Sequence, residues 1–118
     1  MSRNAELLLV EDEAFIGIET EMALEEGGQA PIHVCTDVGT AIAWLEQATP
    51  RAALLDFNLG NGATSEPVAL ALRERGVPLA FLTGYTEATM ALPPSLADAP
   101  RFSKPCHAEE VIAWLEAL

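Results

Sequence analysis

The sequence contains little positive charge, and this shortage excludes two classes of partner. Of its 118 residues only six are Lys or Arg, against 18 Asp or Glu, which gives a formal net charge of −12. A chain this acidic lacks the basic surface that neutralises nucleic-acid phosphates or anionic lipid head groups. We therefore expect neither nucleic acid nor a membrane among its partners.

Long apolar runs and paired cysteines are also missing. No apolar run is long enough to span a bilayer, and the N-terminus lacks the charged-then-apolar pattern of a secretion signal. Cys35 and Cys106 lie far apart without a metal-binding spacing, and His33 and His107 have no partner pattern of a metal or catalytic site. These absences favour a cytoplasmic protein with free thiols.

Short apolar runs alternate with helix-like stretches along the whole chain. Half of the residues are hydrophobic, and such runs are typical of strands buried in a parallel sheet. Pro31 has no amide hydrogen to donate, which predicts an edge position for the second strand. The expected strands cover residues 6–10, 30–35, 52–56, 79–82 and 101–103.

Helical periodicity and end signals occupy the segments between these strands. Phe15, Ile18 and Met22 recur on one apolar face of the first helix, the pattern of a helix that packs on a core. Asp37 is expected to cap the second helix, and Thr64 or Ser65 the third. The expected helices cover residues 13–26, 38–47, about 65–75 and 109–118.

The alternation predicts an α/β fold. Right-handed crossovers place helices on both faces of a five-stranded parallel sheet, giving a three-layer αβα sandwich. Residues 86–92 would form a fourth helix, which Pro93-Pro94 leaves shortened or irregular. No repeat or linker divides the 118 residues, so we expect one domain over 1–118 with nothing appended.

Polar residues stand at the carboxyl ends of four expected strands. Glu11 and Asp12 follow the first, Asp56 ends the third, Thr83 follows the fourth, and Lys104, the only lysine, follows the fifth. Ligands of open parallel sheets bind at these ends, so the side chains should converge on one rim.

Three carboxylates on one rim suit a hard divalent cation. Close together they repel one another, and Mg²⁺ relieves the repulsion while keeping waters and binding phosphate. We expect Asp12 and Asp56 to bind Mg²⁺ directly, Glu11 through a water, and Asn58 through its backbone carbonyl.

Asp56 has a second expected role as a nucleophile. Its carboxylate can accept a phosphoryl group and form an aspartyl phosphate. Lys104 would supply positive charge to the phosphoryl oxygens, and Thr83 a hydroxyl hydrogen bond. The expected chemistry is phosphoryl transfer assisted by Mg²⁺.

In these features the sequence resembles the receiver domain of bacterial two-component response regulators, of the stand-alone type. The resemblance spans essentially the whole chain, through Leu-Leu-Val-Glu-Asp-Glu at 8–13, Leu-Leu-Asp-Phe-Asn-Leu at 54–59, Phe-Leu-Thr-Gly-Tyr at 81–85 and Ser-Lys-Pro at 103–105. It implies a flavodoxin-like strand order 2-1-3-4-5. It also implies phosphoryl transfer to Asp56 from a sensor histidine kinase or a histidine phosphotransfer protein, and self-dephosphorylation tuned by Asn58 and Tyr85. Such a phosphoacceptor is not an enzyme acting on another substrate.

Three departures from the family pattern concern the conformational switch. Leu59-Gly60 stands where most receivers have Met-Pro, Arg101 replaces an aromatic residue three before the lysine, and the fourth helix is irregular. Tyr85 resembles the aromatic that follows Thr-Gly in a group of stand-alone receivers. It either forms the switch with Thr83 or simply packs on the third helix.

The sequence is compatible with two functions. The first is a phosphorylated receiver that signals by phosphorylation-dependent protein binding, or that drains phosphate from a kinase. The second is a pseudo-receiver that acts as a constitutive protein-interaction module. An aspartate phosphatase is a weak third reading, because Asn58 cannot serve as the general acid. We expect a monomer or a weak homodimer. Trp114 and Leu118, if exposed on the last helix, could form the dimer contact.

Overall fold

The computed structural model describes residues 6–60, 62–83, 94–103 and 107–118. Its strands are β1 (Leu7–Val10), β2 (Ile32–Cys35), β3 (Ala52–Asp56), β4 (Leu79–Thr83) and β5 (Arg101–Ser103). Its helices are α1 (Ala14–Glu26), α2 (Val38–Leu45), α3 (Glu66–Glu74), the 3₁₀ helix η2 (Pro94–Leu96) and α4 (Ala108–Glu116). The expected strands and the four principal helices are confirmed, with bounds that differ by up to two residues at most ends. The expected short helix over 86–92 lies outside the described residues.

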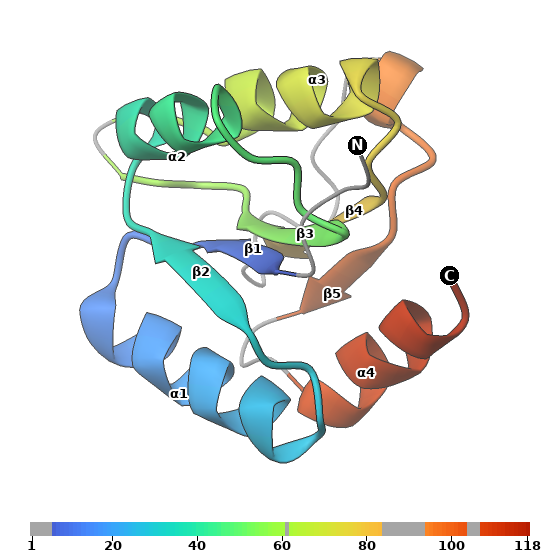
Figure 1. Ribbon diagram of the computed structural model, residues 1–118. Helices are drawn as coiled ribbons and strands as arrows, with labels where there is room; N and C mark the ends of the chain where they lie inside the picture. Colours follow the sequence, from blue (N-terminus) through green and yellow to red (C-terminus); the bar gives the residue numbers. More distant parts are fainter. Residues whose placement is uncertain (1–5, 61, 84–93, 104–106) are drawn as a thin grey trace.

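The strands form one parallel sheet between two layers of helices. Their order is β2-β1-β3-β4-β5, and every neighbouring pair is parallel. Figure 1 shows α2 and α3 on one face of the sheet, and α1 and α4 on the other. The expected αβα sandwich, its flavodoxin-like order and the edge position of β2 are all confirmed.

Both faces of the central strands are buried, so polar residues can be placed only at the ends of these strands. All residues of β1, β3 and β4 are buried. Alternate residues enter two hydrophobic clusters, for example Leu8 and Leu55 on the side of α2 and α3, and Leu9 and Leu54 on the side of α1 and α4. A parallel sheet covered on both faces requires apolar residues throughout its strands, so its chemistry lies at its edges and rims.

The face of α1 that packs on the sheet is not the predicted one. The large apolar residues expected there are exposed, Phe15 at 85%, Ile18 at 52% and Met22 at 55%. The buried residues of α1 are Gly17, Thr20 and Leu24. A Cβ added to Gly17 would meet side-chain atoms of Glu11 and Val34 at 3.7–3.8 Å. Gly17 and Thr20 therefore mark the face that approaches the sheet, and the recurrence of large apolar residues selected the wrong face.

The predicted helix caps are partly confirmed. Asp37 Oδ1 accepts a hydrogen bond from the Thr40 amide at 2.7 Å, as expected for the cap of α2. This hydrogen bond lowers the pKa of Asp37, because it stabilises the charged carboxylate. At α3, Ser65 occupies the cap position without a side-chain cap bond, and Thr64 Oγ1 accepts from the Glu66 amide at 3.3 Å.

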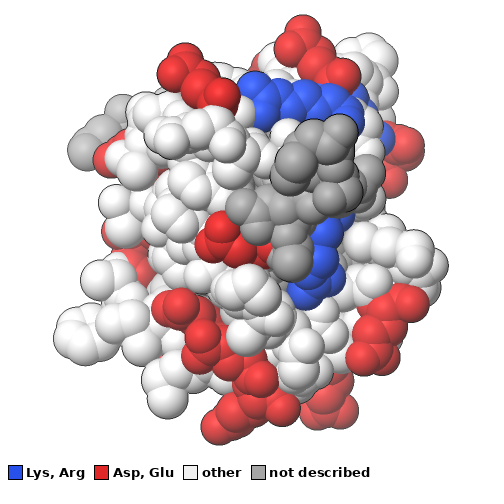
Figure 2. Space-filling view, in the orientation of Figure 1, with Lys and Arg blue, Asp and Glu red and all other residues white. Residues whose placement is uncertain are grey.

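The aromatic and surface residues also agree in part with expectation. His33 stacks on Trp44 with ring centroids 4.5 Å apart, a packing role rather than a metal site. Trp114 of α4 packs on Phe102 at 6.1 Å, whereas Leu118 is 59% exposed. Figure 2 shows acidic side chains spread around one face of the molecule, with far fewer basic ones. Among the described residues, none of the helices has the length and apolar character needed to cross a bilayer.

Candidate functional site

The strand register brings the predicted polar residues to one rim of the sheet. Val10 pairs with Leu55, so Glu11 and Asp12 leave β1 beside the end of β3. Asp56 pairs with Leu82, which places it one residue from the level of Thr83 at the end of β4. The central strands β1, β3 and β4 thus contribute these side chains to one place.

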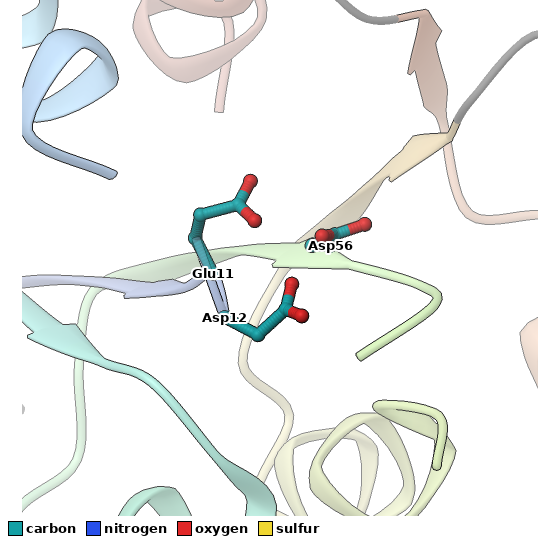
Figure 3. Close-up of side chains that lie close together, drawn as sticks. All are labelled: Glu11, Asp12 and Asp56. Atoms are coloured by element: carbon teal, nitrogen blue, oxygen red, sulfur yellow. The ribbon is translucent and has the colours of Figure 1, made fainter. Parts of the chain in front are cut away.

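Three carboxylates converge there. Glu11, Asp12 and Asp56 each offer one oxygen, and these three oxygens lie within 4.8 Å of one another. Figure 3 shows the three side chains grouped where β1 and β3 end. Glu11 and Asp56 are each 1% exposed, whereas Asp12 is exposed. Carboxylates at this spacing require nearby positive charge or hydrogen-bond donors, because their mutual repulsion disfavours the ionised forms.

The donor set fits a divalent cation of the magnesium type. Mg²⁺ prefers hard oxygen ligands and is usually held by one or two carboxylates together with water and phosphate oxygens. Asp12 and Asp56 supply two such carboxylates, and the exposure of Asp12 leaves the cluster accessible to solvent. The expected indirect role of Glu11 and the expected Asn58 carbonyl ligand remain predictions.

Glu11 also has a structural contact that the sequence pattern did not reveal. Its Oε2 accepts a hydrogen bond from the Glu13 amide at 3.2 Å, and Glu13 is the cap residue of α1. Glu11 therefore fixes the turn from β1 into α1. Two consecutive acids at a strand end give no sign of which one turns inward, so burial separates Glu11 from Asp12.

The loop after Asp56 is closed by its own hydrogen bonds. Leu59 donates its amide hydrogen to the Ala63 carbonyl at 2.9 Å, and Ser65 donates to the Phe57 carbonyl at 3.0 Å. Between them Asn58 and Thr64 form an antiparallel bridge. The side chains of Phe57 and Leu59 are buried. The described residues of the predicted loop, 57–60 and 62–63, are thus held by backbone hydrogen bonds directly after β3.

Of the remaining predicted site residues, Thr83 lies within the described part of the chain, and Lys104 and Tyr85 do not. Thr83 is 5% exposed at the end of β4, on the same rim as Asp56. Lys104 and Tyr85 lie outside the described residues, so their expected roles at the phosphoryl group and in the switch remain predictions.

Cys35, at the end of β2, is not a reactive group. Its side chain is 1% exposed, and burial, with a smaller effect of the Asp37 charge, raises the pKa of this thiol to about 11. A thiol with so high a pKa is protonated at neutral pH and is a poor nucleophile. This agrees with the expectation of a free thiol, while Cys106 lies outside the described residues.

Comparison with known proteins identifies similar structures. No protein-family model and no curated protein matches the chain. SdrG from Sphingomonas melonis Fr1 is 35% identical, with 99% of this chain and 98% of SdrG covered and a TM-score of 0.79. The BeF₃-activated conformation of SdrG from Pseudomonas melonis Fr1 matches with the same identity and coverage and a TM-score of 0.77. The receiver domain of NtrX from Brucella abortus shares the fold, at 21% identity, 94% and 95% coverage and a TM-score of 0.80.

Proposed function

The chain belongs to the receiver domains of response regulators, and from this premise we propose that it accepts a phosphoryl group on Asp56 with the help of Mg²⁺. The observation that carries the proposal is the cluster of Glu11, Asp12 and Asp56, whose oxygens lie within 4.8 Å at the ends of β1 and β3. Packing alone has no use for three acids at this spacing, because their repulsion opposes folding. A metal-assisted phosphoacceptor site gives the cluster a purpose.

Asp12 and Asp56 would hold Mg²⁺ directly, with Glu11 acting through a water and Asn58 through its carbonyl. When bound, the ion neutralises charge on the phosphoryl oxygens. Asp56, the proposed phosphoacceptor, is the last residue of β3 and is 1% exposed. Asp12, which is exposed, is the ligand that an incoming ion meets first.

The transfer step uses a carboxylate oxygen of Asp56 as the nucleophile. It forms a P–O bond while the P–N bond to the imidazole of a donor phosphohistidine breaks, and that nitrogen keeps the electron pair and later takes a proton from solvent. Thr83 and Lys104 are proposed to bind the phosphoryl oxygens. Hydrolysis reverses the modification: a water oxygen attacks phosphorus, the P–O bond to Asp56 breaks, and inorganic phosphate leaves.

The same chain is proposed to accelerate both reactions on itself without acting on a separate substrate. The side chains at Asn58 and Tyr85 flank the path of the attacking water in this proposal and would set the lifetime of the phosphoryl group. Phosphorylation would shift a two-state equilibrium of the segments 57–63 and 83–100, with Thr83 and Tyr85 as the switch. The shifted state would bind a downstream protein, or the chain would drain phosphate from its kinase.

The proposed phosphodonor is a protein, a sensor histidine kinase or a histidine phosphotransfer protein. The exposed apolar residues Phe15, Ile18 and Met22 of α1 support this, because α1 begins two residues after Asp12 and Phe15 lies in its first turn, at the end nearest the rim. A protein donor must cover this area to bring its phosphohistidine to Asp56. Phe15→Ala should therefore slow labelling by a phosphorylated histidine phosphotransfer protein and leave labelling by acetyl phosphate unchanged.

A second candidate is the pseudo-receiver, a binding module without the chemistry. It is favoured by Leu59-Gly60 in place of Met-Pro and by Arg101, which lies exposed in β5 where receivers have an aromatic switch residue. In this case the three acids would have no role in phosphoryl transfer, and Mg²⁺ would change neither the phosphorylation nor the thermal stability of the protein.

Intact mass after incubation with Mg²⁺ and acetyl phosphate decides between the two candidates. We expect one added phosphoryl group on the wild type, none on Asp56→Asn, and none when a chelator removes the metal. Beryllofluoride should protect the wild type against thermal unfolding in the presence of Mg²⁺ only. Absence of both the adduct and the protection would establish the pseudo-receiver instead.

A further inference from the structure

We propose that Gly60 is a positioning residue for Asp12: its missing side chain lets the loop after β3 close over the rim without displacing this carboxylate. Gly60 has φ +82°, and a Cβ built on it would lie 3.3 Å from Asp12 Oδ2. Nothing in the strand and helix pattern of the chain requires a glycine at this place. The inference rests on the proposed function, because it concerns how Asp12 meets Mg²⁺.

The backbone of Gly60 is held in place by its neighbours. Its amide donates to Asn58 Oδ1 at 3.0 Å, and its carbonyl accepts from the Ala63 amide at 2.8 Å. The preceding residue, Leu59, is buried and donates its own amide to the Ala63 carbonyl at 2.9 Å. A side chain at position 60 therefore cannot be relieved by retreat of the loop without breaking this turn, and the Asp12 carboxylate must yield instead.

A small displacement of Asp12 matters more for Mg²⁺ than for a larger ion. Mg²⁺ demands near-ideal octahedral geometry at about 2.0–2.1 Å, whereas Ca²⁺ accepts flexible geometry at about 2.3–2.6 Å. The contact of 3.3 Å is closer than ordinary van der Waals distance, so Asp12 would move by a few tenths of an ångström. Gly60 thus tunes the site toward the smaller ion, and its replacement should lower the preference for Mg²⁺ over Ca²⁺.

Gly62 provides a matched control in the same loop. Its φ is +79°, so alanine there carries nearly the same backbone cost as at Gly60. An ideal Cβ on Gly62 has no heavy atom of the described residues within 4 Å, apart from its own chain neighbours. The two alanine variants therefore share a positive φ and differ in the contact with Asp12.

The test is isothermal titration calorimetry of the full chain with magnesium chloride and, separately, calcium chloride. We expect Gly60→Ala to weaken Mg²⁺ binding by about three- to tenfold relative to Gly62→Ala, and Ca²⁺ binding by no more than about twofold. If Gly60→Ala does not fold, Gly60→Asn and Gly62→Asn replace the pair, because asparagine tolerates positive φ better while still carrying a Cβ.

The outcomes separate the inference from the proposed function. Equal Mg²⁺ affinities of the Gly60 and Gly62 variants, with normal binding by the wild type, overturn the role of Gly60 alone. Equal loss of Mg²⁺ and Ca²⁺ affinity at Gly60 also overturns it, since that pattern indicates a general disturbance of the loop. A wild type that binds no Mg²⁺ overturns the proposed metal site itself, and the inference with it.

Discussion

The three acids at the rim carry the same charge but occupy different environments. Glu11 and Asp56 are 1% exposed, whereas Asp12 is exposed. Glu11 is fixed by its contact with the Glu13 amide, and Asp56 is the last residue of a buried strand. Asp12 is therefore the acid that can be neutralised without leaving an altered group in the core.

Neutralising Asp12 should stabilise the metal-free protein. Asp12→Asn removes one of three carboxylates within 4.8 Å, so we expect the free energy of unfolding in a chelator to rise. A gain of about 0.5–1 kcal/mol is reasonable for an exposed charge. The same substitution should remove most of the stabilisation by Mg²⁺. Urea unfolding with and without Mg²⁺ measures both effects.

The control for this prediction is Glu19→Gln, which removes one exposed charge from α1 away from the cluster. It should change neither the metal-free stability nor the response to Mg²⁺ by a comparable amount. A lower stability of Asp12→Asn in chelator would contradict the repulsion on which the prediction depends.

Among the elements, α1 shows how a helix can bury its small residues. Gly17 and Thr20 face the sheet together with Leu24, and the larger Phe15 and Met22 face outward. A helix face of small residues approaches a sheet closely, and close approach buries more of the backbone and of the sheet surface. The apolar pattern in the sequence contains both faces, and only the packed structure distinguishes them.

Alanine substitutions on the two faces of α1 should differ strongly in cost. Leu24→Ala removes a fully buried side chain and should lower the free energy of unfolding by about 2–5 kcal/mol. Met22→Ala, at a position 55% exposed, should change it by less than about 0.5 kcal/mol. Chemical denaturation of both variants measures the difference. Similar losses for the two would mean that α1 packs through its outer face.

The cap of α2 should make stability depend on pH in acid. The pKa of Asp37 is lowered in the folded state by the hydrogen bond from Thr40, so the folded state favours the charged form. The ionised Asp37 therefore stabilises the folded state above the unfolded pKa of about 3.9, and this stabilisation is lost as the pH falls through the lower folded pKa. Asp37→Asn keeps an oxygen acceptor but cannot titrate.

The stability difference between wild type and Asp37→Asn is the measurable quantity. We expect the wild type to be the more stable of the two near neutral pH, and the difference to shrink as the pH drops below about 4. Denaturant titrations at several pH values follow this change, and all other acids cancel in the comparison. A difference that is independent of pH would show that the Asp37 charge contributes nothing to the cap.

At the scale of the whole molecule, the net charge of −12 is the main electrostatic feature. The 18 acidic residues far outnumber the six basic ones, so negative charges repel one another across the surface. This repulsion opposes the compact folded state. Figure 2 shows that acidic groups are dispersed and not confined to one patch on the visible face. Screening should therefore act on the molecule as a whole.

Salt should raise the thermal stability of the protein even in the absence of divalent metal. An increase in sodium chloride from about 0.01 M to about 1 M shortens the Debye length from about 30 Å to about 3 Å. We expect Tm, measured by circular dichroism in chelator, to rise by about 3–5 °C. The double variant Glu25→Gln and Glu26→Gln, at two exposed positions, should show a smaller rise. A fall in Tm with salt would indicate that favourable ion pairs outweigh the repulsion.

The sequence by itself determined the composition of the fold and of the rim. Fully apolar strands require helices on both faces of the sheet. Polar residues such as Asp56 and Thr83 can then stand only at the ends of the strands. Apolar periodicity and helix-end signals located most strands and helices to within two residues, because both signals depend only on residues close together in the sequence. The strand order followed from the family resemblance rather than from periodicity, since apolar runs do not encode which strand lies beside which.

Tertiary structure alone decided the contacts between distant segments. Glu11 is buried and Asp12 is exposed, and Glu11 packs where α1 approaches at Gly17, a position 6 residues further along the chain. Gly60 lies next to Asp12 although 48 positions separate them in the sequence. Local patterns record the size and polarity of side chains. They do not record the distance between chain segments, which depends on how all the layers pack together.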